Sequence, residues 1–342
     1  MHSISNVANA RWLFWILIAA FSWLMVSRLT EIREVTQPLV QGKPEWILIA
    51  AILQVFYYSA FAAMFKAAFN AVDIRSRIRD LIAVTLGALF VNVIAPTWGM
   101  AGAALYVDDA SHRGESPARA AAGTLLAQAA DYTAFAFILG CAVIYLLMQN
   151  KLESYEIAGT AILIVITCSL TLALVLGLWL PTLLLNSLDL FSKSMNGFSR
   201  RLNKGDLLAD DWAAKNAADF SRSARAIEEH PRRLALTLAV ALLAHLINMA
   251  SLYALFLAFH QQIELGPVVA GYAMGMLFWN ISPVPQGIGL VEGIMVLVYT
   301  SLGIHGLQAT LVVLAFRGLN FWIPMLLGFF LLRKVEILKS KH

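Results

Sequence analysis

The chain is poor in charged residues and in cysteine. Of its 342 residues, 13% are Asp, Glu, Lys or Arg and 60% are hydrophobic, whereas soluble domains carry about 25% charged residues. The two cysteines, Cys141 and Cys168, lie inside apolar stretches, which excludes a disulfide framework and a cysteine-rich metal site. This composition, with a mean hydropathy of +0.72, excludes an ordinary soluble domain and predicts a protein whose solvent is a lipid bilayer.

Sequence motifs of common enzymes are also missing. The chain has no Gly-x-Ser-x-Gly nucleophile motif, phosphate-binding loop, dinucleotide fingerprint or His/Cys metal spacing. We therefore expect no cofactor, no metal and no catalytic residue. The net charge of +4 is modest, and the basic residues are better explained by membrane topology than by nucleic-acid binding.

Long hydrophobic runs are what the chain does have. A helix needs about 20 mostly apolar residues to cross the hydrocarbon core. Such stretches occupy residues 11–29, 46–66, 119–148, 156–180, 233–259 and 308–332. The sequence predicts an all-α, polytopic membrane helical bundle with about six full crossings, forming one domain over residues 1–342.

The longest polar interruption, residues 181–233, is rich in Lys and Arg. We expect it to be cytoplasmic, because short basic loops stay on that side of the membrane. Its apolar residues recur with helical spacing at Leu208, Trp212, Phe220, Ala224 and Ile227. The pattern indicates an amphipathic helix at the membrane interface, started by a cap at Asp210 and Asp211. A solvated linker is the alternative.

Two apolar stretches are interrupted by proline and glycine, at residues 90–102 and 278–289, and both begin with Phe-x-Asn. They indicate an internal repeat, with repeat 1 at about 79–148 and repeat 2 at about 266–333. When the two are aligned, Gln128 and Asp131 correspond to Arg317 and Asn320. Interrupted hydrophobic segments at matching places in two halves point to a transporter's binding site, because broken backbone at membrane depth must line a cavity or be buried in protein.

Each interrupted segment is either one kinked span or a re-entrant helical hairpin. The distribution of Lys and Arg favours two hairpins, because a single crossing at residues 81–107 would move the basic segment 181–233 to the outer side. The first hairpin would then enter from the cytoplasmic face and the second from the outer face, which makes the repeats inverted. We expect both termini in the cytoplasm and a multi-pass location in a bacterial inner (cytoplasmic) membrane.

The run PVPQGIGLVE at residues 283–292, followed by Arg317 and Asn320, resembles the flippase-like membrane domain of lysylphosphatidylglycerol synthases. The resemblance covers nearly the whole chain and implies a role in moving or handling polar lipids. Gln286 stands where that family usually has glycine. The first repeat has Ala103 or Ala104 and Gln128 where the family commonly has a glutamate and an arginine.

Candidate site residues lie at the two breaks and on the helices that follow them. They are Asn92, Pro96, Gly99, Gly102, Gln128 and Asp131 in repeat 1, and Asn280, Pro283, Pro285, Gly287, Gly289, Glu292, Arg317 and Asn320 in repeat 2.

In repeat 2, Glu292 and Arg317 are ionisable residues inside the membrane, which marks a functional site by default. We expect them to pair, either for function or only to hold the hairpin. The half-helix that starts after Gly289 would present free N–H groups to an anion such as a lipid phosphate, with Arg317 nearby.

In repeat 1, Asp131 suits a cationic or hydroxyl-rich part of a headgroup, and the small residues could equally serve helix packing.

Other polar residues give weaker signals. Asp108 and Asp109 resemble paired aspartates that hold magnesium, but a third aspartate is missing. His245 and Asn248 lie one helical turn apart, which is typical of an interhelical hydrogen bond.

These features predict a lipid translocase for a phosphate- or sugar-bearing headgroup. The alternatives are a lipid-modifying enzyme acting through Asp108, Asp109 or Glu292, and an accessory subunit of a lipid or glycolipid synthase. Expected partners are membrane lipids, anionic or glycosylated, and a lipid-synthesis enzyme; no nucleic acid is expected.

Overall fold

The computed structural model describes residues 42–94, 99–179, 211–229, 231–282 and 284–339, with short pieces at 185–186, 189–190, 192–194, 196–197 and 209. Every regular element in this part of the chain is a helix. The predicted first crossing, residues 11–29, lies outside the described residues. The all-α prediction is confirmed.

Four of the described helices are long and apolar enough to cross a membrane: α3 (Pro44–Ala71), α6 (Pro117–Met148), α10 (Pro231–Ala258) and the run Gly306–Leu331. The first three begin with proline, which suits the first helical turn because that turn has no use for the missing N–H. A further helix, α7, runs from Ser154 to Trp179. Together these helices form a polytopic membrane bundle.

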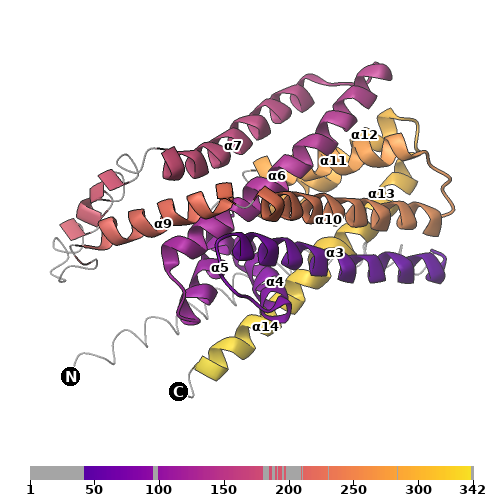
Figure 1. Cartoon of the computed structure of the whole chain (residues 1–342). Coiled ribbons are helices and arrows are strands. Elements are labelled where there is room, and N and C mark those ends of the chain that lie inside the picture. Colours follow the sequence, from indigo (N-terminus) through magenta and orange to yellow (C-terminus); the bar gives the residue numbers. More distant parts are fainter. Residues whose placement is uncertain are drawn as a thin grey trace.

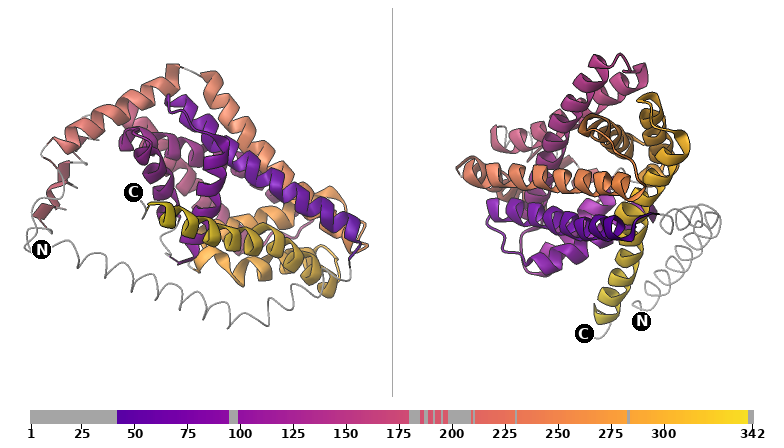
Figure 2. Two further views of the ribbon diagram at one scale, coloured as in Figure 1. Left: turned by 90° about the horizontal axis from the view of Figure 1, so that it is seen from below. Right: turned by 90° about the vertical axis from the view of Figure 1, so that its right-hand side faces the viewer.

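Helices α3 and α10 run side by side along the bundle (Figures 1 and 2). At one end the Lys43 N–H donates to the Ala258 carbonyl, and at the other Arg233 forms an ion pair with Asp73 at 2.7 Å. The two helices are therefore antiparallel.

The first interrupted segment folds back on itself as two helices, α4 (Ile78–Ile94) and α5 (Met100–His112). The Tyr106 hydroxyl donates to Thr85 Oγ1 at 2.8 Å, and the Gly102 N–H donates to Asn92 Oδ1 at 2.7 Å. Residues before and after the break therefore pair in antiparallel order. At 17 and 13 residues, the helices are about 26 and 20 Å long. Each is shorter than the hydrocarbon core, which is about 30 Å thick.

The second interrupted segment is also a hairpin, formed by α11 (Leu265–Ile281), the 3₁₀ turn η1 (Pro285–Gly287) and α12 (Leu290–Ser301). A Cβ on Gly271 would overlap the Tyr299 ring, and one on Gly275 would lie 2.6 Å from Met295. The glycines thus let the two helices approach closely. The structure confirms two helical hairpins and excludes two kinked spans.

The hairpins enter the bundle from opposite ends (Figure 1). The first hairpin begins near the Asp73–Arg233 pair. Its second helix leads back to helix α9, where Ser116, just after the hairpin, donates to Asp219. The second begins beside the end of α6, because Gly266 packs against Tyr145. This arrangement is the one expected for inverted repeats; the repeat boundaries and the sides of the membrane stay predictions.

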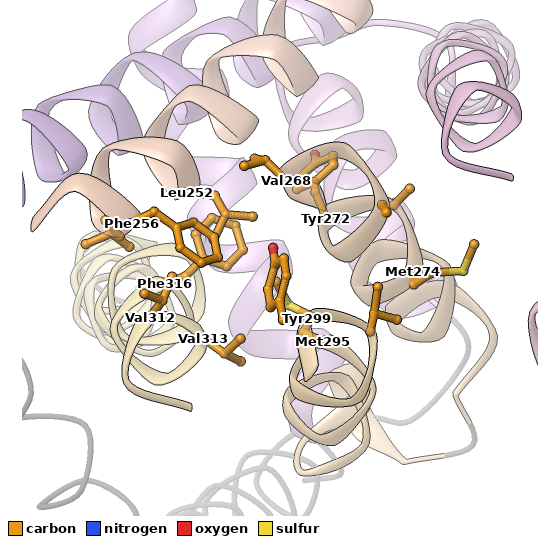
Figure 3. Close-up of a cluster of buried hydrophobic side chains, with 14 of the residues drawn as sticks. Leu252, Phe256, Val268, Tyr272, Met274, Met295, Tyr299, Val312, Val313 and Phe316 are labelled. Carbon is orange, nitrogen blue, oxygen red and sulfur yellow. The ribbon is translucent and has the colours of Figure 1, made fainter. Parts of the chain in front are cut away.

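A hydrophobic core surrounds the second hairpin (Figure 3). The side chains labelled in Figure 3 come from α10, α11, α12 and α13 (Gly306–Arg317), and α6 adds further buried residues such as Phe135 and Leu139. Phe256 and Tyr299 meet edge to face with ring centroids 5.0 Å apart. The π-helical turn η2 (Gly318–Trp322) continues α13, and α14 (Ile323–Lys339) follows.

The amphipathic helix predicted in the basic segment is present as α9 (Trp212–Glu229), which begins directly after Asp211. Its buried residues include Ala213, Ala217 and Phe220, spaced by four and three, and it packs against α6, α7 and α10. Within the basic segment, Trp212–Glu229 therefore form a helix packed against the bundle and not a solvated linker. Leu208 and Asp210 lie outside the described residues.

Candidate functional site: a cavity between the hairpin tips

The tips of the two hairpins meet inside the bundle and border a cavity of about 220 Å³. A single water needs about 10–15 Å³ of such volume, so the cavity has room for a polar group of several heavy atoms. The lining comes from both tips and from the middles of α3, α6 and α10. It includes Asn92, Gly99, Gly102, Gln128, Asp131, Asn280, Pro285 and Asn320 from the predicted set.

The two asparagines of the repeated Phe-x-Asn motif occupy the cavity wall on opposite hairpins. Asn92 accepts a hydrogen bond from the Gly102 N–H across the first tip. Asn280 donates to the carbonyl of Met276 in its own helix at 2.8 Å. The repeat in the sequence thus places one amide on each side of the cavity.

Aromatic side chains make up much of the remaining wall. They are Tyr57, Tyr58, Phe61, Phe65, Tyr106, Tyr132 and Trp279. Phe65 stacks on Tyr106 with ring centroids 3.8 Å apart and planes 5° apart. Sequence reasoning missed these residues, although the i, i+4, i+8 spacing of Tyr57, Phe61 and Phe65 puts them on one helix face and could have signalled the wall.

The one carboxylate among the described lining residues is Asp131, on α6. Its Oδ1 lies 3.2 Å from Nε2 of His245 on α10. This is an ion-pair distance, but neither atom makes a hydrogen bond. The His245 side chain is 3% exposed, and none of the described lining residues is Lys or Arg. His245 therefore contacts the cavity's only described carboxylate, a role that its spacing to Asn248 did not predict.

Behind His245 a chain of polar side chains runs through the core. His245 Nδ1 lies 2.8 Å from the Tyr272 hydroxyl, and Asn248 Nδ2 donates to that hydroxyl at 3.4 Å. Asn248 Oδ1 in turn accepts from Gln54 and Asn320 at 2.9 and 3.0 Å. The expected interhelical hydrogen bonding of Asn248 is confirmed, and it connects α10 to α3, α11 and η2.

The π-helical turn explains how Asn320 reaches this network. An extra residue in the turn changes the direction of the side chains that follow it, and such turns are frequent at functional sites. Asn320 lines the cavity and is 3% exposed, and its carbonyl accepts a hydrogen bond from Tyr58 at 2.6 Å. No feature of the sequence separates this turn from ordinary helix.

Glu292 and Arg317 form the ion pair expected from the sequence, with Arg317 Nε 2.5 Å from Glu292 Oε1. Arg317 Nη2 donates to the Gln286 carbonyl at 3.1 Å. The guanidinium carbon lies 4.6 Å from the Trp279 ring centroid and 4.5 Å from that of Phe321. The arginine thus connects α13 to the tip and to the second helix of the hairpin, and it lies outside the described cavity lining.

Glu292 also occupies the helix end at which the sequence predicted an external anion. Its Oε2 accepts from the Gly289 N–H at 2.7 Å, so the chain's own carboxylate caps the N-terminus of α12. Gly287 and Gly289 have φ values of +63° and +83° and form the turn before this helix. None of the three lines the cavity.

Gln286, the departure from the glycine expected at this place, has a φ of +54° and lines the cavity. Left-handed backbone favours glycine, which gives a physical reason for glycine as the usual residue at this position. The side-chain oxygen of Gln286 is buried without a hydrogen-bond partner.

Two predicted residues, Pro96 and Pro283, lie outside the described residues. Asp108 and Asp109 lie on α5 away from the described lining, where they pair with His112 and Arg113. Among the described residues no group of three or more His, Cys, Asp or Glu could hold a metal ion.

Comparison with known proteins gives the family. The profile of the lysylphosphatidylglycerol synthase TM region matches residues 12–328. A UPF0104 membrane protein of Methanocaldococcus jannaschii is 22% identical over 332 residues, covering 95% of this chain and 96% of that relative. Another, from Methanothermobacter thermautotrophicus, is 20% identical over 297 residues, covering 86% and 87%. Both relatives are archaeal, so the expected bacterial origin gains no support from them. The chain belongs to the family of the lysylphosphatidylglycerol synthase TM region.

Proposed function

We propose that this protein translocates a lipid, with the polar headgroup passing through the cavity between the hairpin tips while the lipid tails stay in the bilayer. The observation that carries the proposal is the position of the cavity. Its lining residues Tyr57 and Asp131 lie near the middles of α3 and α6, and transporters bind their substrates near the membrane midplane between repeats.

The chemistry of the wall suggests the kind of headgroup. Phenol and amide groups can donate to hydroxyl groups and accept from them, and a carboxylate can accept from them. Aromatic faces can pack against the apolar faces of a sugar ring. Arg317, the arginine expected to bind phosphate, is engaged by Glu292, Gln286 and two aromatic rings. The cavity therefore favours a sugar or another hydroxyl-rich group over a phosphate. The family's name, which refers to a synthase of a polar lipid, supports a lipid as the substrate class.

Reconstitution tests the proposal. Liposomes of phosphatidylglycerol and phosphatidylethanolamine would carry a trace of fluorescent glycosyl diacylglycerol or fluorescent phosphatidylglycerol, and dithionite quenching would report movement between leaflets. We expect the glycolipid to move at least tenfold faster with the protein than in empty liposomes.

A matched pair of variants assigns the movement to the cavity. A Cβ on Gly102 would lie 2.5 Å from Asn92, whereas one on Gly140 would meet nothing within 4 Å. We expect Gly102→Val to reduce the rate at least tenfold and Gly140→Val to leave it unchanged. Equal rates for folded wild type and Gly102→Val would contradict the proposal, as would the absence of movement for every lipid.

A further inference from the structure

The Asp131–His245 pair is the part of the described cavity lining that contains an acidic group without a permanently charged partner. Arg317 in the core already has its counter-ion in Glu292. Asp131 has only a histidine, whose charge depends on a proton. A carboxylate at the middle of a membrane helix is costly unless it is neutralised. Among the residues that the structure describes, only a proton on the pair supplies the positive charge that would neutralise it.

Hydrogen bonds behind the histidine indicate which nitrogen carries the proton. Asn248 Oδ1 accepts from two amide groups, so its Nδ2 faces the Tyr272 hydroxyl and donates to it. That hydroxyl keeps its own hydrogen for His245 Nδ1. The proton of a neutral His245 then lies on Nε2, the nitrogen that is 3.2 Å from Asp131 Oδ1, and the neutral imidazole leaves the pair with a net charge of −1.

The described residues around the pair offer no other charge to balance it. The titratable groups that face it are the hydroxyls of Tyr57 on α3, Tyr106 on α5, Tyr132 on α6 and Tyr272 on α11. All are neutral phenols at physiological pH. Among the described residues, the proton on the Asp131–His245 pair alone decides whether the cavity is neutral or negative.

We propose that the Asp131–His245 pair is a proton-binding site and that lipid movement through the cavity is coupled to proton movement. This inference rests on the proposed function, for which it names the energy source. Protonation makes the pair neutral overall, and the lipid-free cavity can then open to the other face of the membrane without carrying a net charge through the bilayer. A bound headgroup whose hydroxyl groups donate to Asp131 takes the place of the proton, and the deprotonated cavity changes faces only with lipid bound, so that each lipid moves in exchange for one proton.

Protein in lipid nanodiscs allows a test that does not depend on transport. With ¹⁵N-labelled histidine, NMR would follow the protonation of His245 as pH is changed. We expect the ¹⁵N signals of His245 to report binding of a proton as pH is lowered, and this response to change in Asp131→Asn. A His245 signal that does not titrate, or that is indifferent to Asp131→Asn, overturns the proton site.

The coupling is tested in the same glycolipid liposomes with a pH difference of two units across the membrane. One proton per lipid allows at most about a 100-fold difference in lipid concentration between leaflets. We expect the labelled glycolipid to redistribute by several fold, and Asp131→Asn and His245→Gln to abolish the effect of the gradient. A distribution that follows a sodium gradient, or neither gradient, overturns the coupling.

A second Asp–His pair in this chain is a matched control. Asp108 and His112 lie 3.4 Å apart on α5, with both side chains more than half exposed. Asp108→Asn and His112→Gln should keep wild-type redistribution; loss of coupling in these variants as well would contradict a role specific to Asp131 and His245. If no lipid moves at all while His245 titrates as expected, the proposed function fails and the proton site stands.

Discussion

Arg317 shows how one residue can be recognised from the sequence and still have a different role in the structure. Its side chain is 1% exposed, and it holds Glu292, the Gln286 carbonyl and two aromatic rings at once. Leaving a buried charge without its partner costs about 3–5 kcal/mol. The pair therefore anchors the second hairpin in addition to any effect on lipid.

Removing one member of this pair should be much worse than removing both charges. We expect Arg317→Ala to lower the free energy of unfolding by about 3–5 kcal/mol, because the half-buried Glu292 is then left without its counter-ion. Arg317→Met combined with Glu292→Gln should lose less than half of that. Unfolding in mixed micelles, followed by circular dichroism, measures both.

Arg317→Lys is the control for geometry, because an ammonium group cannot reproduce the two directed contacts of the guanidinium group. Arg317→Lys should lose more free energy of unfolding than the double variant Arg317→Met with Glu292→Gln. A single Arg317→Ala variant as stable as the double variant would show that the pair has no anchoring role.

Among single residues, the sequence predicted those whose chemistry is unusual in a membrane. Glu292, Arg317 and Asp131 stand out because charge is rare there. It could not predict that Glu292 and Arg317 form an ion pair outside the described cavity lining while Asp131 meets His245 at the cavity. That difference depends on which side chains are brought together from helices far apart in the chain.

At the scale of elements, the first hairpin is packed against the last helix through Gly328. A Cβ on this glycine would overlap the carbonyl of Leu86 in α4. Glycine thus allows the backbones of α4 and α14 to touch, as small residues do between membrane helices.

Gly328→Ala should therefore separate α4 from α14. We expect a loss of about 1–3 kcal/mol in the free energy of unfolding, the usual cost of overpacking. Gly140→Ala, on α6 with open space around it, should be neutral or slightly stabilising, because alanine favours helix. Both can be measured by thermal unfolding in detergent; equal melting temperatures for the two variants would contradict the close contact.

The hairpins were predictable as elements because proline and glycine interrupt apolar runs at two matching places. The charge distribution then favoured a returning chain. The positive φ of Gly99, Gly287 and Gly289 agrees with the reading of these residues as turns. The π-helical turn at Gly318–Trp322 was not predictable, because it depends on contacts of Asn320 with α3 and α10.

At the scale of the whole molecule, the opposite entry of the hairpins makes a prediction about topology. Arg75 and His112 flank the first hairpin, and Gln262 and Ser301 flank the second; all four are exposed. Single cysteines at these positions, in a chain with Cys141 and Cys168 replaced by serine, would be labelled in intact cells with an impermeant maleimide.

We expect labelling at Gln262→Cys and Ser301→Cys without lysis, and at Arg75→Cys and His112→Cys only after lysis. This pattern follows from the basic residues near the first pair. Different accessibility of Arg75→Cys and His112→Cys would show that the first segment crosses the membrane, and the inverted arrangement would then be wrong.

The sequence by itself determined that this protein is a bundle of membrane helices with two interrupted segments, because hydrophobic length and helix-breaking residues act locally. It also identified the family and most residues at the hairpin tips. Tertiary structure alone decided which polar groups share the cavity. Asp131, His245, Asn320 and the aromatic wall come from helices distant in sequence, and their meeting depends on how those helices pack, which no local pattern encodes.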